Sequence, residues 1–360
     1  MTIPKPSRRS MNTLRSWQPM AASGKQAAVV EFRLAQFWQK GRSMKAVIFD
    51  RFGGPEVLQV ATLPDIHPPG PTQLLVRVLA TSVNPLDIQK RRGDYPEAVP
   101  LPAVIGSDVS GVVTAVGESV QSFRPGDEVY YTPPLFAPGG YAEHHVIEET
   151  VVARKPGGMS HTDSAALPLA GGTAWEALFE RACLQPGEKV LVHAAAGGVG
   201  SLAVQMAKDA GAVVLATCGG GNIEFVRSLG ADHVFDYRTC DFVRAVLDVT
   251  EGVDVVLDTV GGETLAQSIE VVRAGGRMVS IVDTPYQLSL LPAYERNLTI
   301  HLMFTTLNGN RLARIREMVE RQSIRPVIHA VFPIRQAGEA HRLIEAGGIR
   351  GKVVLDLSQW

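Results

Sequence analysis

The sequence predicts an α/β protein of two domains, a β-rich domain followed by a doubly wound parallel sheet that helices cover on both faces. Three observations support this prediction. The chain has 360 residues, which is more than one typical domain. Between residues 44 and 152, short apolar runs alternate with Gly/Pro turns, as in an all-β unit. From residue 189 onward, continuous apolar runs alternate with helical stretches, which indicates βαβ units.

The β-rich domain is expected to span residues 44–168. Its first strand is the apolar run MKAVIF at residues 44–49. Further short strands, with turn signals between them, are expected at residues 73–83, 110–117, 126–133 and 141–149. A helix is expected at residues 167–182, and the pattern of the sequence changes there.

The second domain is expected to span residues 169–324. Its strands are continuous apolar runs, which is typical of strands that are buried on both faces. They are expected at residues 189–194, 212–217, 233–237, 253–260 and 276–282. The helices between them are expected at residues 201–210, 223–230, 242–249 and 263–273.

The C-terminal part of the chain returns to a mixture of helices and strands. Helices are expected at residues 311–321 and 337–347, and strands at residues 326–332 and 351–357. These elements follow the last βαβ unit, so we expect residues 325–360 to rejoin the first domain and complete it.

The composition excludes several classes of function. The formal net charge is −1, so there is no electrostatic reason to expect nucleic acid or an anionic membrane as a partner. No apolar run approaches the roughly 18 residues of a membrane span. The cysteines, Cys183, Cys218 and Cys240, form no C-x-x-C pair and no even disulfide set. A reducing compartment is therefore expected, and we predict a cytoplasmic protein.

Residues 1–43 differ from the rest of the chain. They hold eight Lys or Arg residues, one acidic residue (Glu31) and several serines, without a pattern of strands and turns. This composition can suit a mitochondrial transit peptide, but we favour a disordered tail or an over-long start before Met44. No apolar segment of the secretory type is present, so export is not indicated. A mitochondrial location is the alternative if this segment is a transit peptide.

The segment VLVHAAAGGVG, residues 190–200, resembles the phosphate-binding turn G-x-G-x-x-G with Ala195 in place of its first glycine. It follows a buried strand and opens a helix, whose unpaired N–H groups suit a pyrophosphate. Gly197 allows close approach of the phosphates, and Gly200 allows close packing of helix and strand. An alanine in the left-handed region costs about 1–2 kcal/mol. We therefore expect Ala195 to keep a negative φ and Gly198 to supply the flexibility; a structural turn without a ligand is the alternative.

The end of the second strand of this domain should select the cofactor. NAD enzymes place an Asp or Glu there for the ribose hydroxyls, whereas residues 216–222, ATCGGGN, contain no acid. Without that carboxylate a 2′-phosphate is not repelled, so we predict NADPH. No Lys or Arg lies in the turn itself. Arg227, Tyr237 and Arg238 are the nearest candidates for the phosphate, and each could instead be an ordinary surface residue.

Five segments together resemble the medium-chain dehydrogenase/reductase superfamily, and within it the zinc-independent quinone oxidoreductase branch of zeta-crystallin-like enzymes. They are VNPLDIQKRRGDYP (83–96), GSDVSGVVTAVGESVQSFRPGDEVY (106–130), GGYAEH (139–144), AALPLAGGTAW (165–175) and AAAGGVG (194–200). The resemblance runs from Met44 to about Leu357. It implies a GroES-like catalytic domain, a Rossmann domain, a cleft between them and a homodimer.

The resemblance also predicts an enzyme without a metal. The zinc dehydrogenases of the superfamily use a Cys and a His–Glu pair, whereas the matching positions here are Asn84 and Gly106-Ser107-Asp108. No set of four closely spaced cysteines is present. His144 and His145 are adjacent in an expected strand, so they point to opposite faces and suit one metal poorly. We predict no metal ligands.

Without zinc to polarise a carbonyl, the expected reaction is hydride transfer from NADPH to a small-molecule acceptor that is already electrophilic, a quinone or an α,β-unsaturated carbonyl. The chain is thus predicted to be an NADPH:quinone oxidoreductase-like enzyme. Two alternatives stay open: an enone or alkenal reductase, and a non-enzymatic NADPH-binding protein of the crystallin type.

Two residues are catalytic candidates. Asn84 offers an amide near the nicotinamide or the acceptor oxygen, or it caps the turn before Pro85. Tyr95 either donates a hydrogen bond or proton to a developing enolate, or lines the pocket, which we favour. Asp87 is expected to brace its own turn.

The resemblance assigns Thr173, at the start of the linking helix, to the nicotinamide side, and makes Met303 and Phe304 part of its pocket wall. Arg350 is expected to reach the cofactor from the C-terminal segment. The full set of predicted cofactor residues is Thr173, Ala196, Gly197, Gly198, Val199, Gly200, Asn222, Tyr237, Arg238, Val260, Met303, Phe304 and Arg350.

Overall fold

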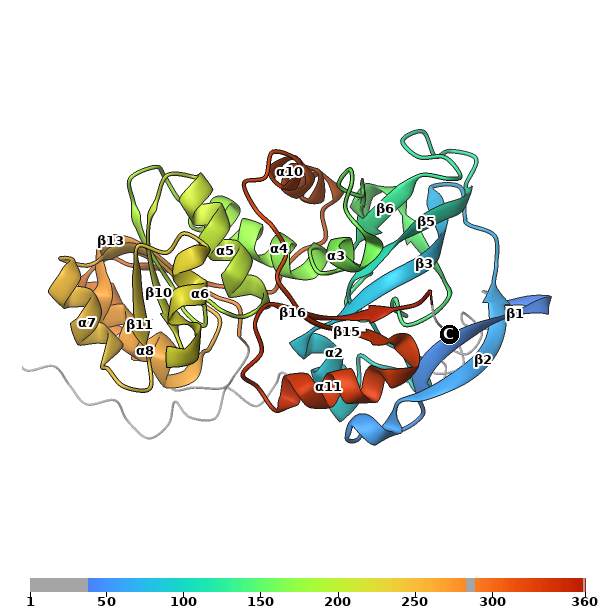
Figure 1. Cartoon of the computed structure of the whole chain (residues 1–360), viewed down its shortest axis with the longest axis horizontal. Coiled ribbons are helices and arrows are strands. Elements are labelled where there is room, and N and C mark those ends of the chain that lie inside the picture. Colours follow the sequence, from blue (N-terminus) through green and yellow to red (C-terminus); the bar gives the residue numbers. More distant parts are fainter. Residues whose placement is uncertain (1–37, 283–288, 359) are drawn as a thin grey trace, which may run out of the picture.

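The structure is a computed structural model that describes residues 38–282, 289–358 and 360. Two domains lie side by side, with helix α4 (Pro168–Trp175) and strand β16 (Lys352–Asp356) between them (Figure 1). One is β-rich and the other is built on a parallel sheet, so the predicted fold class is confirmed. Of the predicted tail, residues 1–43, the first 37 lie outside the described residues.

The β-rich domain contains two sheets. The smaller has the strand order β2 (Gln59–Ile66), β1 (Trp38–Phe49), β4 (Ala103–Val104). The larger has the order β15 (Ile328–Pro333), β16, β3 (Gln73–Val83), β5 (Val109–Val116), β6 (Glu128–Tyr131), β8 (Val152–Arg154), and β7 (His144–Glu148) also pairs with β3. Because β16 pairs antiparallel with β3, the C-terminal strands lie inside the sheet of the first domain.

Strand β1 begins at Trp38 rather than at Met44. Its backbone continues to pair with β2 beyond an irregularity between Gln39 and Ser43. The apolar alternation that predicted the strand starts only at Met44, which is buried. The pattern therefore marked the buried part of the strand and missed the paired extension before it.

The second domain has a parallel sheet with the order β11 (His233–Asp236), β10 (Val213–Cys218), β9 (Lys189–Val192), β12 (Val253–Asp258), β13 (Val272–Ser280), β14 (Thr299–Leu302). Two halves diverge from the β9–β12 pair, which is the doubly wound arrangement. Its helices are α5 (Gly198–Asp209), α6 (Ile223–Ser228), α7 (Phe242–Val249), α8 (Gly262–Val271) and α9 (Leu291–Glu295). On one face, Val246 and Ile269 of α7 and α8 pack on Leu191 and Val256 of the sheet.

The remaining helices pack on the β-rich domain, and α10 also contacts α4. They are α2 (Pro85–Arg92), α3 (His161–Ala165), α10 (Gly309–Glu320) and α11 (Ala337–Glu345), with short 3₁₀ turns at Pro55–Val57, Glu149–Val151, Gly220–Asn222 and Ile334–Gln336. Helix α4 continues as a π-helix over Glu176–Arg181. One apolar core runs from the β-rich sheet through Leu167 and Leu178 to Leu202 of α5. The two domains therefore pack on each other through a shared core.

Candidate active site

The cofactor turn lies between β9 and α5, and its left-handed residue is Ala194, with φ 47°. Ala195 keeps out of the left-handed region, as expected. The expectation that Gly198 supplies the flexibility is wrong, because Gly198 does not adopt a positive φ. A glycine fits there because space is limited: a Cβ at this position would lie 2.8 Å from Lys352 Cδ.

The start of α5 is left open toward the predicted pyrophosphate. Gly197 is its N-cap residue and has no side chain to accept the N–H groups of the first turn. A Cβ on Gly200 would lie 2.4 Å from the carbonyl oxygen of Ala194, so only glycine allows this close contact of helix and turn. The turn thus combines free helix N–H groups with a backbone that a ligand can approach closely.

The other predicted cofactor residues follow the carboxyl ends of the parallel strands. Asn222 comes after β10, Arg238 after β11, Val260 after β12 and Phe304 after β14. Because parallel strands end at one edge of a sheet, the structure brings these positions to the same edge as the glycine turn (Figure 1). Tyr237 and Val260 are about half exposed there, and Met303 is buried.

An open cavity of about 560 Å³ lies beyond the end of β10. It is lined by Gly219, Gly221, Asn222, Arg238, His329, Gly348 and Arg350. The Arg350 guanidinium donates to the side chain of Asn222 and to the carbonyl of Gly221, both at 2.7 Å. It also lies 5.2 Å from the ring centre of Phe225. Three predicted residues therefore meet in one positively charged cavity, joined by His329, which the sequence did not indicate.

A carboxylate that the sequence did not indicate lies next to this cavity. Asp236 ends the third strand, β11, and accepts the backbone N–H of Arg238 at 3.0 Å. A Cβ on Gly220 would lie 2.5 Å from Asp236 Oδ2. An acid therefore lies close to the end of the second strand, although it comes from the neighbouring strand β11.

Asn84 lies at the start of α2 and is buried. It is the N-cap residue of α2, and Asp87 accepts its backbone N–H at 3.0 Å. Its side-chain amide donates to Asp108 Oδ2 at 2.7 Å, and its oxygen accepts from the Lys352 ammonium. Both ends of the amide are therefore bound within the protein, which favours a positioning role over direct contact with an acceptor.

Asp87 braces its turn through several contacts. Besides the N–H of Asn84, its carboxylate accepts the N–H of Gly106 at 3.2 Å and the hydroxyl of Ser107 at 2.7 Å. Lys90 lies 3.6 Å from it and is also buried. Burial lowers the pKa of Lys90, while the charge of Asp87 acts in the opposite direction.

Asp108 and Lys352 are site residues that the sequence did not indicate as such. Asp108 is fully buried and accepts from the Leu169 backbone N–H (2.7 Å) and from the Ser82 hydroxyl (2.5 Å). Lys352 Nζ lies 3.3 Å from Asp108 Oδ2. Lys352 follows Gly351, whose N–H donates to the carbonyl of Ala196 in the glycine turn at 2.7 Å.

Three aromatic rings from both domains contact one another. The ring of Tyr95 packs edge-on against Phe136, with 5.2 Å between centroids. Phe136 stacks on Phe304 at 6.0 Å with an interplanar angle of 5°. Phe136 also lines an apolar cavity of about 640 Å³ in the β-rich domain. The sequence indicated Tyr95 and Phe304 but not Phe136, which comes from a separate loop.

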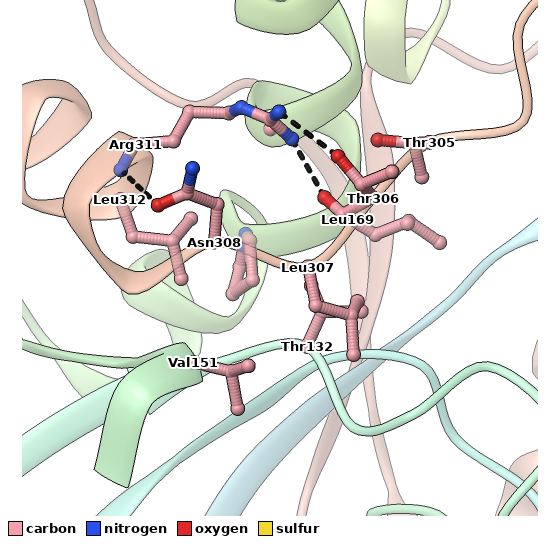
Figure 2. A pocket seen from close by; sticks show the side chains of 11 residues that line it. Thr132, Val151, Leu169, Thr305, Thr306, Leu307, Asn308, Arg311 and Leu312 are labelled. Atoms are coloured by element: carbon pink, nitrogen blue, oxygen red, sulfur yellow. Dashed lines mark hydrogen bonds between the residues drawn. The ribbon is translucent and has the colours of Figure 1, made fainter. Parts of the chain in front are cut away.

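A buried ion network fixes the segment that follows β14. Glu176 accepts from the Thr306 N–H at 2.9 Å and lies 3.0 Å from Arg311 Nη1. Arg311 also donates to the carbonyl of Thr306 at 2.7 Å (Figure 2). Its guanidinium donates further to both oxygens of Glu180. Burial would raise the pKa of Glu176, but the N–H of Thr306 and the arginines outweigh it and the pKa is lowered.

Figure 2 also shows Asn308 accepting the Arg311 N–H at the start of α10. The pocket drawn there has a volume of only about 10 Å³, room for at most about one water. It is therefore a packing gap of the ion network rather than a ligand site. Thr173 lies nearby, in the last turn of α4 and not at the start of the linking helix, which begins at Pro168.

The predicted pair of adjacent histidines begins strand β7. His145 is buried and bonded to the Tyr131 hydroxyl and the Pro138 carbonyl, both at 3.1 Å. Across the described ranges, 38–282, 289–358 and 360, no group of three His, Cys, Asp or Glu side chains could hold a metal ion. Metal-free chemistry stays a prediction. None of the helices in the same ranges is long and apolar enough to cross a membrane.

Comparisons with known proteins identify the family of the chain. Residues 70–157 match the family model "Alcohol dehydrogenase GroES-like domain", and residues 229–355 match "Zinc-binding dehydrogenase". The mitochondrial NAD(P)H oxidoreductase RTN4IP1 of Bos taurus is 34% identical, over 87% of this chain and 89% of its own. The 2-methylene-furan-3-one reductase of Solanum lycopersicum is 36% identical, over 87% of this chain and 79% of its own. The quinone oxidoreductase structure from Coxiella burnetii has a TM-score of 0.81 at 33% identity, covering 88% of this chain and 100% of that one.

A GroES-like domain joined to a Rossmann domain defines the medium-chain dehydrogenases and reductases, which are oxidoreductases. The chain belongs to this superfamily, in its zinc-independent quinone oxidoreductase branch, and the predicted resemblance is confirmed.

Proposed function

We propose that this protein is an NADPH-dependent reductase that transfers hydride to a quinone or an α,β-unsaturated carbonyl without a metal. The observation that carries the proposal is the stacking of Phe136, from the β-rich domain, on Phe304, which follows β14 at the strand-end edge of the sheet that also carries the glycine turn. Two of the similar proteins, the quinone oxidoreductase from Coxiella burnetii and the 2-methylene-furan-3-one reductase from tomato, are named for the same acceptor classes, which supports this choice.

The residues at the sheet edge fit a dinucleotide phosphate. The uncapped first turn of α5 suits the pyrophosphate, since its N–H groups have no side-chain acceptor. Arg238 and Arg350 line the cavity beyond β10, where a 2′-phosphate would extend. The Asp236 carboxylate nearby already accepts the N–H of Arg238, which reduces its repulsion of a phosphate. These contacts support the choice of NADPH over NADH.

When bound, the nicotinamide would supply the hydride, and the chain would orient the acceptor and exclude water. Reduction of a quinone takes up that hydride and one proton and gives the hydroquinone. The stacked faces of Phe136 and Phe304 suit planar conjugated acceptors, because offset stacking favours flat rings. Tyr95 packs edge-on beside them, in keeping with a role in lining the pocket.

The function is tested by NADPH oxidation against 1,4-benzoquinone, 9,10-phenanthrenequinone, an alkenal and an alcohol/NADP⁺ pair. Turnover with the quinones is expected, and the alcohol pair should be inactive. Turnover with the alkenal alone would identify an enone reductase instead. Tight NADPH binding without turnover on any acceptor would contradict the enzymatic role and favour a binding protein.

Removing either arginine of the cavity should weaken NADPH selectively. For Arg238→Ala or Arg350→Ala we expect a rise of about tenfold in the NADPH dissociation constant, because a charge-assisted contact to the 2′-phosphate is lost. The NADH constant should hardly change. Arg227→Ala is the matched control, since Arg227 pairs with Glu224 and does not line the cavity. Equal affinities of the parent protein for NADH and NADPH, measured by fluorescence titration, would contradict the assignment of NADPH.

We keep a homodimer as part of the proposal, by analogy with the branch. From the cysteine usage we propose a cytoplasmic location. The mitochondrial alternative is supported by the similarity to the bovine protein, which is named as mitochondrial. Residues 1–37, which carry most of the basic segment, lie outside the described residues.

A further inference from the structure

Two buried ion pairs flank Asn84. One is Lys352–Asp108 (3.3 Å) and the other is Lys90–Asp87 (3.6 Å). The Asn84 amide nitrogen links them, since it lies 2.7 Å from Asp108 Oδ2 and 3.4 Å from Asp87 Oδ2. A buried pair must satisfy its remaining hydrogen-bonding groups to offset the loss of hydration. Here the surrounding residues do so, and the cluster is held as one unit.

Lys352 has no hydrogen-bond donor left for a ligand. Its ammonium donates to the Val83 carbonyl at 3.1 Å, to the Asn84 side-chain oxygen and to Asp108. These three acceptors match the three hydrogens of an ammonium. Its aliphatic part lies against Gly198, where a Cβ would come within 2.8 Å of Cδ. Lys352 therefore contacts the glycine turn by packing, while its charge is committed to the β-rich domain.

The Lys352–Asp108 pair contacts the beginnings of three helices. Asn84 caps α2, and Gly198 opens α5. The N–H of Leu169, in the first turn of α4, donates to Asp108 Oδ1 at 2.7 Å. Helix α2 leads to Tyr95 on the acceptor side, and α5 carries the cofactor turn. The pair thus connects three parts of the protein at one buried point. They are helix α2, which leads to Tyr95, the linking helix α4, and the cofactor turn.

We propose that Lys352 is a positioning residue of the reduction. By holding Asn84 and Asp108 against Gly198, it sets the distance between the cofactor turn and helix α2, which leads to the acceptor side. This role rests on the proposed function. Because a misplacement of about 1 Å between reactants costs on the order of 100-fold in rate, loss of the pair should lower kcat. Cofactor affinity should change little, since no donor of Lys352 is available to the phosphates.

The test compares Lys352→Met with the double variant Lys352→Met/Asp108→Asn. The single variant leaves the Asp108 charge buried without its partner, which destabilises the fold by itself. The double variant removes both charges and keeps the shapes. We expect it to regain thermal stability yet keep a kcat at least about tenfold below the parent, with KM for NADPH within about threefold.

Lys155→Met is the matched control. Lys155 is as buried as Lys352, at 5% exposure, and lies at the same 3.3 Å from its carboxylate, Glu128. It is outside the cleft, so its variant should keep the parent kcat. A double variant with the kcat of the parent would overturn the proposal, because Lys352 would then contribute only to the stability of the fold. A raised KM for NADPH with unchanged kcat would overturn it too, since Lys352 would then be a phosphate ligand.

A second readout separates this inference from the proposed function. Hydrogen exchange of the hydrogen-bonded amides of Asn84, Asp87, Gly197 and Ser201 should be faster in the double variant than in the parent, and unchanged in Lys155→Met. Unchanged exchange in the double variant would contradict the positioning role. If the parent reduces no acceptor at all, the proposed function fails, while the exchange result still decides whether Lys352 holds the two segments together.

Discussion

Lowering the pH from 7 to 5 should reduce the free energy of unfolding by about 5 kcal/mol. Three histidines, His145, His193 and His341, are buried, and burial lowers the pKa of each to about 4. In the unfolded chain a histidine has a pKa of about 6.5. Between these two pKa values the histidines are protonated in the unfolded state but not in the folded state, so the free energy of unfolding falls as the pH decreases. Each histidine contributes about 2 kcal/mol at pH 5.

The contacts of these histidines explain why they stay neutral. His193 lies between the hydroxyls of Thr217 and Ser268, both at 2.9 Å, and the charge of Asp258 only partly offsets its burial. His341 bonds to the Tyr141 hydroxyl at 3.0 Å. Its burial outweighs the favourable charge of Asp87, and the charge of Arg91 lowers its pKa further.

Urea unfolding at pH 7, 6 and 5 measures this effect. His193→Gln should remove about a third of the pH dependence, because one of three similar groups no longer titrates. The exposed His233 supplies the control, and His233→Gln should leave the slope as in the parent. A free energy of unfolding that is equal at pH 7 and pH 5 would contradict the assignment of neutral buried histidines.

Arg311→Leu should lower the free energy of unfolding by about 3 kcal/mol. Glu176 keeps its contact with Arg181 at 2.6 Å but loses Arg311, and the carbonyl of Thr306 loses its donor. Arg311 is 4% exposed and Glu176 is fully buried. The guanidinium also holds Thr306 and Glu180, so the segment after β14 loses its anchor on α10 (Figure 2). Displacement of that segment would also disturb Phe304 on the acceptor side.

The same helix supplies the control for this prediction. Arg314 is 66% exposed and pairs with Glu317 at 3.3 Å, a surface contact that contributes little. Arg314→Leu should therefore unfold close to the parent in urea. If Arg311→Leu were as stable as Arg314→Leu, the buried network would not hold the segment.

The order of the elements and the edge of the cofactor site were predictable because they depend on local patterns. An apolar strand, a glycine turn and a helix follow one another within residues 189–209, and parallel strands then bring their ends together. The exact left-handed position was not predictable in this way. The turn needs one such residue, and the structure uses Ala194 rather than a glycine.

The residues that the sequence did not indicate come from segments far apart in the chain. Lys352 and Asn84 are 268 positions apart, and no periodicity connects them. Phe136 belongs to a loop without a motif and becomes a site residue only by stacking on Phe304. Asp108 attracted attention as a lost metal position, but its role follows from four donors that converge on it.

The pairing of β16 with β3 has a consequence for synthesis of the protein. Strand β16 lies between β15 and β3 in the sheet of the first domain, yet it is made after the entire second domain. Domains usually fold in the order in which they leave the ribosome. Here the first domain to emerge lacks the strand that pairs with β3, and with it the buried Lys352, until the C-terminal segment is added. A nascent chain that stops short of that residue carries a cofactor domain but no finished cleft.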